Sequence, residues 1–330
     1  MKYDPRVRPS RILVLGAGGV GCAIGGLLAR AGCSVVLVAR GAHGDVLRER
    51  GLTLRTPSWS DVLHVPVVAS PREVAFSSGD VVLLAVKSQD TAAALADLAE
   101  VAPRDTPIVC AQNGVSNEGL AAEFFPRAHG MLVFLPATFL VPGQVDIHSD
   151  PLPGSLDVGP WPTGTDDLSA ALASELRRAG FEACATPNIS RLKYGKLLTN
   201  LVGAIQALLS GPWHESPWIA RVEAEAVACF RAAGIAYATS DEIRARYARI
   251  LDLPVAGCPR AGGSTWQSLA RGASSIETDA LNGEIVRLGE AWGVPTPVNR
   301  ALVELCRRAV AERLAPGRMT QGDLDRALPG

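Results

Sequence analysis

Hydrophobic positions follow two different periods along the chain, and the change comes a little past its middle. In the first part, short runs of consecutive apolar residues alternate with stretches of helical spacing. Uninterrupted runs rich in β-branched residues, bounded by helices, are typical of parallel strands that are buried on both faces. The predicted strands are residues 11–16, 34–39, 81–86 and 107–112, and the predicted helices are residues 20–32, 91–102 and a segment from about 117.

Two segments of this first part depart from the alternation. Residues 51–69 have the pattern of a hairpin-type insertion, and residues 131–160 indicate antiparallel strands joined by turns that contain Pro and Gly. A short helix is predicted near residues 167–179. Strands that alternate with helices predict an α/β fold, with an N-terminal Rossmann-type doubly wound sheet.

From about residue 187 onward, long helical patterns replace the strands. They cover residues 190–210, 216–234, 239–251, 265–271, 275–293 and 297–314. Strand candidates are few in this part, so we predict an all-helical C-terminal domain. The boundary is placed near Pro187, which gives a nucleotide-binding domain of residues 1–186 and a helical substrate domain of residues 187–330.

The helix predicted at residues 190–210 has two distinct faces. One is an apolar stripe at helical spacing, formed by Leu198, Leu201, Val202, Ile205, Leu208 and Leu209. The other stripe is polar at one end and small at the other, and consists of Lys193, Lys196, Asn200, Gly203 and Ala207. We interpret the first as a packing face and the second as the floor of a cleft. The alternative is a solvated face with a lysine whose stem lies along apolar surface.

The glycine-rich segment GAGGVG at residues 16–21 follows the first predicted strand and opens the first helix. That context predicts a dinucleotide-binding loop, in which glycines allow a tight turn, close approach of a pyrophosphate and packing of the helix on the sheet. The N–H groups of the helix N-terminus would bind the phosphates. The predicted cofactor contacts are Gly16, Gly18, Gly19, Val20 and Gly21. The alternative is a glycine-rich turn without a ligand.

Arg40 occupies the end of the second predicted strand. An NAD site usually has Asp or Glu there to bind the ribose 2′-hydroxyl group. An arginine instead favours a 2′-phosphate through charge-assisted hydrogen bonds, so we predict NADPH as the cofactor. A surface arginine without this role is the alternative.

Lys87 and Asn113 each follow a predicted strand of the sheet. Ligands of doubly wound folds bind outside the carboxyl ends of the strands. We therefore predict both residues near the place where cofactor and substrate meet. A solvated lysine and an ordinary Asn-Gly turn are the alternatives.

Composition narrows the functional classes further. The 330 residues carry a formal net charge of −1, which gives no electrostatic argument for binding nucleic acid or an acidic membrane surface. No apolar run reaches the roughly 18 residues of a membrane-spanning helix. The polar first ten residues lack the apolar core of a secretory signal, so we expect a cytoplasmic protein.

Cysteine and histidine spacing gives no sign of a disulfide framework or a metal site. The seven cysteines include no CxxC pair, and the five histidines form no HExxH motif. We therefore predict no metal. A serine hydrolase is also disfavoured, because the chain has no GxSxG elbow.

Several of these segments, in the same order, resemble the ketopantoate reductase family (2-dehydropantoate 2-reductases). The resemblance covers nearly the whole chain. It includes GAGGVG at 16–21, AVKSQD at 85–90, QNGVSNE at 112–118 and KLLTN at 196–200. Its most specific part begins at residue 264, where STWQSLARG is followed by ETDALNGEIVRLGEAWGVPTPVN.

The resemblance implies NADPH-dependent reduction of an α-keto acid to a hydroxy acid, in a cleft between a Rossmann domain and a helical domain. The catalytic lysine of the family matches Lys196, and its helix asparagine matches Asn200. The serine and glutamate that contact the substrate match Ser264 and Glu277. The remaining matches are Lys87, for the lysine after the fourth strand, and Asn113, for the asparagine of the Asn-Gly pair.

Elementary chemistry agrees with these roles. Hydride addition to a ketone builds negative charge on its oxygen, and a positioned ammonium group can stabilise that charge and then donate a proton. Lysine suits this task because partial burial lowers its pKa toward neutrality. Glu277 could orient Lys196 or bind a substrate hydroxyl group. Ser264 and Asn200 are neutral hydrogen-bonding groups suited to a carboxylate or carbonyl oxygen.

Three features depart from the family pattern on the substrate side. Four residues after Asn200, where the family commonly has Asn followed by Pro, this chain has Ala204 followed by Ile205. The segment from Ser264 to Glu277 is one residue longer, and Thr265 stands where Met is common. We expect Ala204 to face the cleft and to widen its floor, which would favour a bulkier or less polar keto acid.

Four functions are therefore compared. The first is reduction of ketopantoate in pantothenate biosynthesis, and the second is the same chemistry on another keto acid or an imine. A regulator that has lost catalysis is disfavoured, because it would not need all four of Lys196, Asn200, Ser264 and Glu277. Dehydrogenases of the 6-phosphogluconate or glycerol-3-phosphate type should show their own helix signatures and basic clusters, which are not found. The expected partner is a small keto substrate, and a homodimer is left open.

Overall fold

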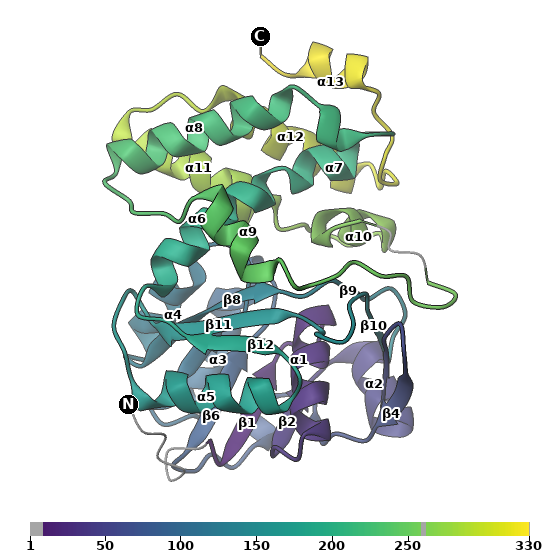
Figure 1. The fold of residues 1–330 in the computed structure, drawn as a ribbon, viewed down its shortest axis with the longest axis vertical. Coiled ribbons are helices and arrows are strands. Elements are labelled where there is room, and N and C mark those ends of the chain that lie inside the picture. The colour runs from purple at the N-terminus through teal and green to yellow at the C-terminus, as the bar shows by residue number, and fades with distance from the viewer. Residues whose placement is uncertain (1–8, 259–261, 330) are drawn as a thin grey trace. The chain divides into compact units, whose positions relative to one another are not determined.

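The computed structural model describes residues 9–258 and 262–329 (Figure 1). The chain forms two compact units. One comprises residues 1–192 together with 241–260, and the other comprises residues 193–240 together with 261–330. The first unit holds the sheets and the second is built of helices, so the predicted α/β fold with a helical C-terminal region is confirmed.

The first unit is organised around an eight-stranded sheet in the order β12-β11-β8-β7-β6-β1-β2-β5. Neighbouring strands are parallel, except that β11 runs antiparallel to β8. The strands are β1 (Arg11–Leu15), β2 (Val35–Val38), β5 (Val67–Val68), β6 (Asp80–Leu84), β7 (Ile108–Cys110), β8 (Ala128–Phe134), β11 (Ser155–Pro160) and β12 (Glu182–Ala185). Strands β2 and β5 lie on one side of β1, whereas β6 and the later strands lie on the other. The strand order therefore reverses between β1 and β6, which is where doubly wound folds bind ligands.

Helices cover both faces of this sheet, and the sequence of β1 shows why. Successive side chains of a strand point to opposite faces. Val14 joins the core that contains helices α1 (Gly19–Arg30) and α5 (Asp167–Arg178). Leu13 joins the core that contains α3 (Thr91–Ala99) and α4 (Asn117–Phe124). An apolar run without alternation is therefore what a strand between two helical layers requires.

A second, four-stranded sheet has the order β4-β3-β10-β9. Strands β3 (Leu52–Arg55) and β4 (Ser60–Leu63) are antiparallel, which confirms the hairpin predicted at residues 51–69. Strand β10 (Gln144–Ile147) is antiparallel to β9 (Ala137–Thr138) but parallel to β3. The antiparallel strands predicted for residues 131–160 are confirmed by the pairs β9–β10 and β8–β11, and the additional parallel pairing of β10 with β3 was not predicted.

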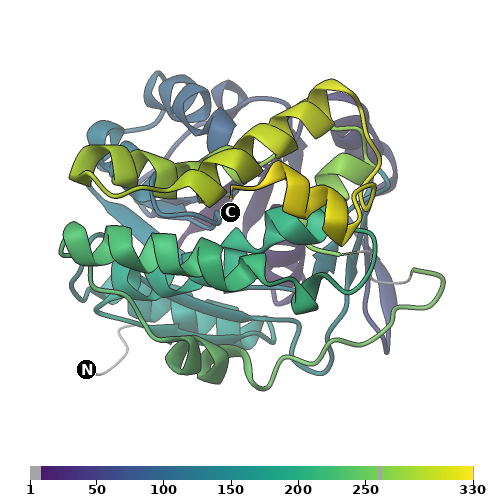
Figure 2. The same ribbon diagram turned by 90° about the horizontal axis from the view of Figure 1, so that it is seen from above.

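The second unit is a bundle of helices. Its described helices are α7 (Gly203–Leu208), α8 (Trp218–Ala232), α10 (Ser264–Ala270), α11 (Thr278–Trp292), α12 (Pro297–Ala311) and α13 (Gln321–Ala327), with the second part of α6 (Ile189–Leu201). Helices α8, α11 and α12 pack against one another, as the view from above in Figure 2 shows. Helix α12 buries Val298, Leu302, Cys306 and Ala309, which lie at helical spacing on one face.

The helix predicted at residues 190–210 is interrupted at Val202, between α6 and α7. An interrupted helix leaves carbonyl groups that need other partners. Here the side-chain amide of Asn282 donates to the Leu201 carbonyl at 3.2 Å and to Asn299 Oδ1 at 3.0 Å. Asn282 and Asn299 are fully buried, so a polar network from distant helices fixes the interruption.

Helix α9 (Ser240–Tyr247) belongs to the first unit, although it follows helices of the second. Its Arg246 donates to the buried Asp157 of β11 through Nε at 2.7 Å. The segment that follows is tied to the same unit, because the Leu253 N–H donates to the His148 carbonyl at 2.8 Å. Charge pairing thus groups residues that a boundary near residue 187 would assign to the other domain.

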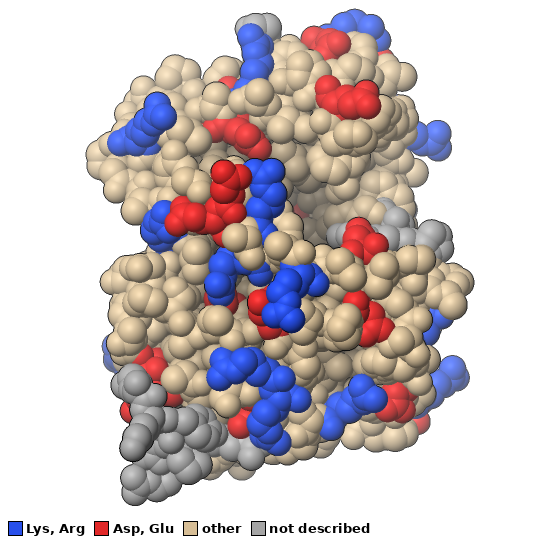
Figure 3. Space-filling model, in the orientation of Figure 1, with Lys and Arg blue, Asp and Glu red and all other residues tan. Residues whose placement is uncertain are grey.

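Charged side chains are dispersed on the face drawn in Figure 3, where basic side chains lie beside acidic ones. In the first unit, Arg191 pairs with Glu242 and Arg249 pairs with Glu182. Among the described helices, none is both long and apolar enough to cross a membrane. Within the same residues, no group of three or more His, Cys, Asp or Glu side chains could hold a metal ion.

Candidate active site

The loop after β1 requires glycine at two positions. Gly16 has φ +106°, and a Cβ atom added there would lie 2.4 Å from the Val86 amide nitrogen. A Cβ atom added at Gly21 would lie 2.1 Å from the Gly16 carbonyl oxygen. The two glycines therefore let the loop approach the segment after β6 and let α1 begin directly against the loop.

Gly18 differs from these two glycines because space is open beside it. A Cβ atom added at Gly18 would meet nothing within 4 Å. Gly18 is also the N-cap of α1, and no side chain caps that end. Gly19 and Val20, the first residues of α1, are partly exposed. A bare helix N-terminus beside open space has the geometry of a phosphate site.

His43 braces this loop, and sequence reasoning missed it. Its Nδ1 accepts the Gly143 N–H at 2.9 Å, so the ring proton lies on Nε2, which donates to the Ala17 carbonyl at 2.6 Å. Burial lowers the pKa of His43, which favours this neutral form. The imidazole therefore fixes a carbonyl in the middle of the glycine-rich loop. His43 belongs to no motif or hydrophobic pattern in the sequence, so this contact could not be predicted.

Arg40 lies on the same edge of the sheet as the loop. Strand β2 ends at Val38, which pairs with Leu15 at the end of β1. Arg40 follows two residues later, is exposed, and precedes α2 (Gly41–Arg50). Arg40 therefore lies at the same edge of the sheet as the glycine-rich loop, and its side chain is accessible to solvent.

Lys87 and Asn113 follow β6 and β7 at this edge, and buried amides connect their loops. Asn117 Nδ2 donates to the Asn113 carbonyl and to Ser88 Oγ, each at 3.1 Å. Gln112 Nε2 donates to the Val86 carbonyl at 2.9 Å, on the other side of Lys87. The two loops therefore form one braced unit. Gln112, Ser88 and Asn117 were not singled out by sequence reasoning, although they lie inside the motifs that were.

Lys196 lies on α6 in the second unit, among charged side chains. The side chain keeps some exposure but is surrounded by protein, and this burial is the main cause that lowers its pKa to about 7. Lys193 lowers the pKa further through charge repulsion, and Glu277 opposes the shift. Lys196 and Glu277 are 81 positions apart in sequence, yet the fold brings their charges close enough to interact.

Two cations near this lysine were not assigned a function from sequence. Lys193 is 5% exposed, one turn before Lys196 on α6. Arg271 interacts electrostatically with Glu277 and is partly buried, and the burial lowers its pKa. Lys196 and Arg271 each interact with Glu277, and Lys193 interacts with Lys196, so positive charge is in excess here. Such a site favours an anionic ligand, for example a carboxylate.

Gly195 allows α6 to pack closely against the segment that contains Ala238. A Cβ atom added at this position would lie 2.5 Å from the Ala238 carbonyl oxygen and 2.8 Å from its methyl group. The helix therefore approaches the segment before α9 more closely than any other residue would permit. Asn200 follows Lys196 by one turn of the same helix and is partly exposed.

Ser264 begins α10, which packs on α7 just beyond Asn200. Gln206 Oε1 accepts the Gly263 N–H at 2.9 Å and fixes the start of α10. Ser264 is exposed to solvent. These contacts connect Ser264 to the helix pair that carries Lys196 and Asn200.

Ala204 does not face open space, contrary to expectation. It is 2% exposed on α7, so its methyl group packs against protein. Because the methyl group has no open space beside it, the change from Asn to Ala does not widen an accessible floor beside Asn200. The argument from Ala204 for a bulkier substrate is therefore not supported.

Comparison with known proteins extends over the same two parts of the chain. The model of "Ketopantoate reductase PanE/ApbA" matches residues 12–163, and that of "Ketopantoate reductase PanE/ApbA C terminal" matches residues 188–310. A solved PanE/ApbA family ketopantoate reductase from Ralstonia eutropha JMP134 is 31% identical, with a TM-score of 0.76, and the alignment covers 92% of this chain and 99% of that one. The chain belongs to the ketopantoate reductase family.

More distant similarities agree with the ketopantoate reductase assignment. A 2-dehydropantoate 2-reductase from Archaeoglobus fulgidus is 28% identical over 311 residues, which is 91% of this chain and 98% of the relative. A solved D-mandelate dehydrogenase, in a ternary structure with NADH and anilino(oxo)acetate, is 23% identical, with a TM-score of 0.77 over 92% of this chain and 99% of that one. The latter likeness concerns the fold alone. As a member of this family, the chain is an oxidoreductase that acts on a keto group.

Proposed function

We propose that this ketopantoate reductase family member reduces 2-dehydropantoate to pantoate with NADPH, and that Lys196 donates the proton. The observation that carries the proposal is Lys196 itself, a lysine with a pKa near 7 beside Glu277. A general acid is most effective when its pKa is close to the working pH. Pantoate formation would place the protein in pantothenate biosynthesis.

The loop after β1 fits a nicotinamide dinucleotide, because the space beside Gly18 is open and no side chain caps α1. We assign the pyrophosphate to Gly16, Gly18, Gly19, Val20 and Gly21, and the 2′-phosphate to Arg40. Lys87 and Asn113 would contact the cofactor from the next two loops, and Asn113 would also contact substrate. When bound, NADPH supplies the hydride that is added to the carbonyl carbon.

The residues of the chain perform the rest of the reaction. Lys196 Nζ stabilises the negative charge that develops on the substrate oxygen and then transfers a proton to it, so the C=O group becomes CH–OH. Lys193 and Arg271 favour the substrate carboxylate by charge. Glu277 orients Lys196 or binds the substrate hydroxyl group, and Asn200 and Ser264 donate hydrogen bonds to substrate oxygens.

A second candidate keeps the chemistry and changes the substrate. It is favoured by the likeness of the fold to a D-mandelate dehydrogenase bound to anilino(oxo)acetate, a bulkier compound with an aromatic ring. The longer segment between Ser264 and Glu277 and the Thr265 departure also lie on the substrate side. The burial of Ala204 removes the main argument for extra space, so ketopantoate remains the first candidate.

A panel of keto acids distinguishes the two candidates. We expect ketopantoate to give the highest kcat/KM, at or above about 10⁴ M⁻¹s⁻¹. The measurement is loss of NADPH absorbance with ketopantoate, pyruvate and phenylglyoxylate at matched concentrations. A kcat/KM for phenylglyoxylate that exceeds that for ketopantoate would transfer the proposal to aromatic keto acids.

Replacing Arg40 by alanine tests the choice of cofactor. A lost charge-assisted hydrogen bond costs roughly 1.5–3 kcal/mol, so the KM for NADPH should rise by about 10- to 100-fold. The KM for NADH should change little, because NADH has no 2′-phosphate. Arg50→Ala, which removes an exposed arginine from the other end of α2, is the matched control. Equal weakening of both cofactors in Arg40→Ala, or a wild-type preference for NADH, would contradict the assignment.

A further inference from the structure

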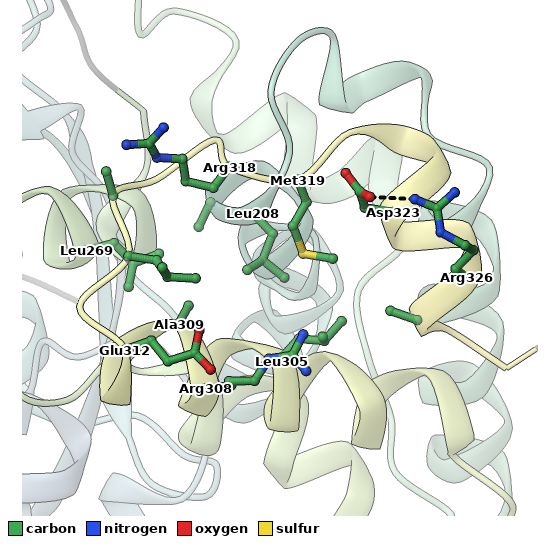
Figure 4. Close-up of a pocket in the computed structure, with 14 residues that line it drawn as sticks. Leu208, Leu269, Leu305, Arg308, Ala309, Glu312, Arg318, Met319, Asp323 and Arg326 are labelled. Atoms are coloured by element: carbon green, nitrogen blue, oxygen red, sulfur yellow. Dashed lines mark hydrogen bonds and ion pairs between the residues drawn. The ribbon is translucent and has the colours of Figure 1, made fainter.

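A cavity of about 510 Å³ lies within the helical unit and shares no residue with the candidate active site. Its walls come from the end of α7, from Leu269 of α10, from α12 and from the C-terminal segment, residues 314–327. In Figure 4, the apolar side chains of Leu208, Leu305 and Met319 point toward its centre. The volume is within the range of small-molecule sites, and nine of the fourteen lining residues are apolar.

The C-terminal wall is held by hydrogen bonds and is therefore a defined part of the fold. The Gly317 and Met319 N–H groups donate to the carbonyls of Ala207 and Leu208, each at 2.9 Å. Trp218 Nε1 donates to Asp325 Oδ1 at 2.7 Å and anchors α13. The carbonyls at the end of α7 thus obtain partners from the same segment that closes the cavity.

One arginine at the edge of the cavity is available to bind an anionic group. Three arginines and two carboxylates line it, and Arg326 is paired with Asp323 at 2.6 Å. Arg308 and Arg318 have no ion pair with any residue in the described ranges, and Glu312 is the one remaining acid of the lining. Arg308 and Glu312 border the cavity along one edge in Figure 4, while the Arg318 guanidinium is turned outward. Arg308 is therefore the cation that remains available to a ligand in the cavity, with the Glu312 carboxylate on the same edge.

We infer that this cavity binds a small amphipathic carboxylate, with its apolar chain among Leu208, Leu305 and Met319 and its carboxylate on Arg308. A guanidinium group presents paired N–H donors that match a carboxylate. The nucleotide is too polar for the apolar interior. The short and polar keto acid of the proposed reaction would fill little of the cavity. The inferred ligand is therefore a different compound from the substrate and cofactor.

Calorimetric titration of the full chain with octanoate, hexanoate and 1-octanol tests the inference. Octanoate should bind at one site with a Kd of about 1 mM or tighter. Each methylene removed should weaken binding by about threefold to fourfold. 1-Octanol has the same chain without the charge, and it should bind at least about tenfold more weakly, as expected for a lost charge-assisted hydrogen bond.

Charge variants on α12 locate the site. Arg308→Gln should weaken octanoate binding by about tenfold and leave 1-octanol unchanged, whereas Glu312→Gln should strengthen octanoate binding. Arg307→Gln is the matched control, since Arg307 is adjacent in sequence, pairs with Asp279 and does not line the cavity. Met319→Trp should fill the cavity and abolish binding of both ligands, and thermal unfolding would verify that this variant is folded.

Three outcomes would overturn the inference. One is the absence of octanoate binding, and another is equal affinity for octanoate and 1-octanol. The third is an equal loss of octanoate affinity in Arg308→Gln and Arg307→Gln, because binding would then follow net charge and not the cavity. None of these results depends on reductase activity, so they are independent of the proposed reaction.

Discussion

Replacing Lys196 by alanine should lower kcat for keto-acid reduction by about two to four orders of magnitude, the range for a lost general acid. Nucleotide affinity should be nearly unchanged, because the assigned cofactor residues all lie in the other unit. Lys196→Arg is the informative second variant. Arginine keeps the positive charge but does not release its proton, so substrate binding should be retained better than turnover. Steady-state kinetics and nucleotide titration give both quantities.

The pH profile separates proton donation from a role in packing. Burial lowers the pKa of Lys196 to about 7, so the ammonium form is lost as pH rises through that value. Reductive kcat should therefore fall above about pH 7, and this limb should be absent in Lys196→Ala. Near-wild-type turnover in the alanine variant, or the same limb in both proteins, would remove Lys196 from the mechanism.

The free energy of unfolding should rise with pH over the range in which reductive kcat falls. The unfolded chain keeps the ordinary lysine pKa near 10.5, so between about pH 7 and 10.5 it binds more protons than the folded chain. Burying this ammonium group therefore destabilises the protein at pH 7 and below, and the cost fades as pH rises toward 10.5. Lys196→Met should raise the midpoint of thermal unfolding at about pH 6–7 while abolishing activity, as expected where a site is strained for function.

Replacing Gly21 by alanine should abolish nucleotide binding by disturbing the fold. The added Cβ atom would lie 2.1 Å from the Gly16 carbonyl oxygen, which is a backbone atom that cannot move alone. Overpacking of this kind typically costs about 1–3 kcal/mol, and the loop would shift as a whole. Thermal unfolding and NADPH titration should therefore both show a loss.

Gly18→Ala is the matched control for that variant, since it adds the same methyl group three residues earlier. Nothing lies within 4 Å of the added Cβ atom, and φ at Gly18 is −81°, so stability should be retained. NADPH affinity should nevertheless fall by about 10- to 100-fold, because the methyl group occupies the space assigned to the pyrophosphate. Wild-type affinity in Gly18→Ala would mean that the phosphates bind elsewhere.

Much of the architecture could be predicted from local sequence patterns. Strand β1 was predictable because a run buried on both faces is apolar at every position, and its residues do divide between two cores. Gly16 and Gly21 were predictable because close backbone contacts leave no alternative residue. Helix α2 and helix α13 were not predicted, since their sequences GAHGDVLRER and QGDLDRA have no apolar stripe long enough to show the helical period.

Pairings between distant segments were decided only by the tertiary structure. Local sequence predicted strands within residues 131–160, but not that β10 has β3 as a neighbour. The interruption of the helix at Val202 depends on Asn282, whose amide replaces a bond that local sequence would have assigned within the helix. Likewise, the grouping of α9 with the sheet depends on Arg246 and Asp157.

The candidate site also combines residues that were predicted from sequence with properties that only the tertiary structure decided. The family motifs, which are local, predicted Lys196 and Glu277. Lys193 and Arg271 could be connected with them only in the folded structure, where Lys193 interacts with Lys196 and Arg271 interacts with Glu277. A sequence specifies which groups are ionisable, because that is a property of each residue. The pKa of Lys196 depends on burial and on charges from other helices, so only the tertiary structure could determine it.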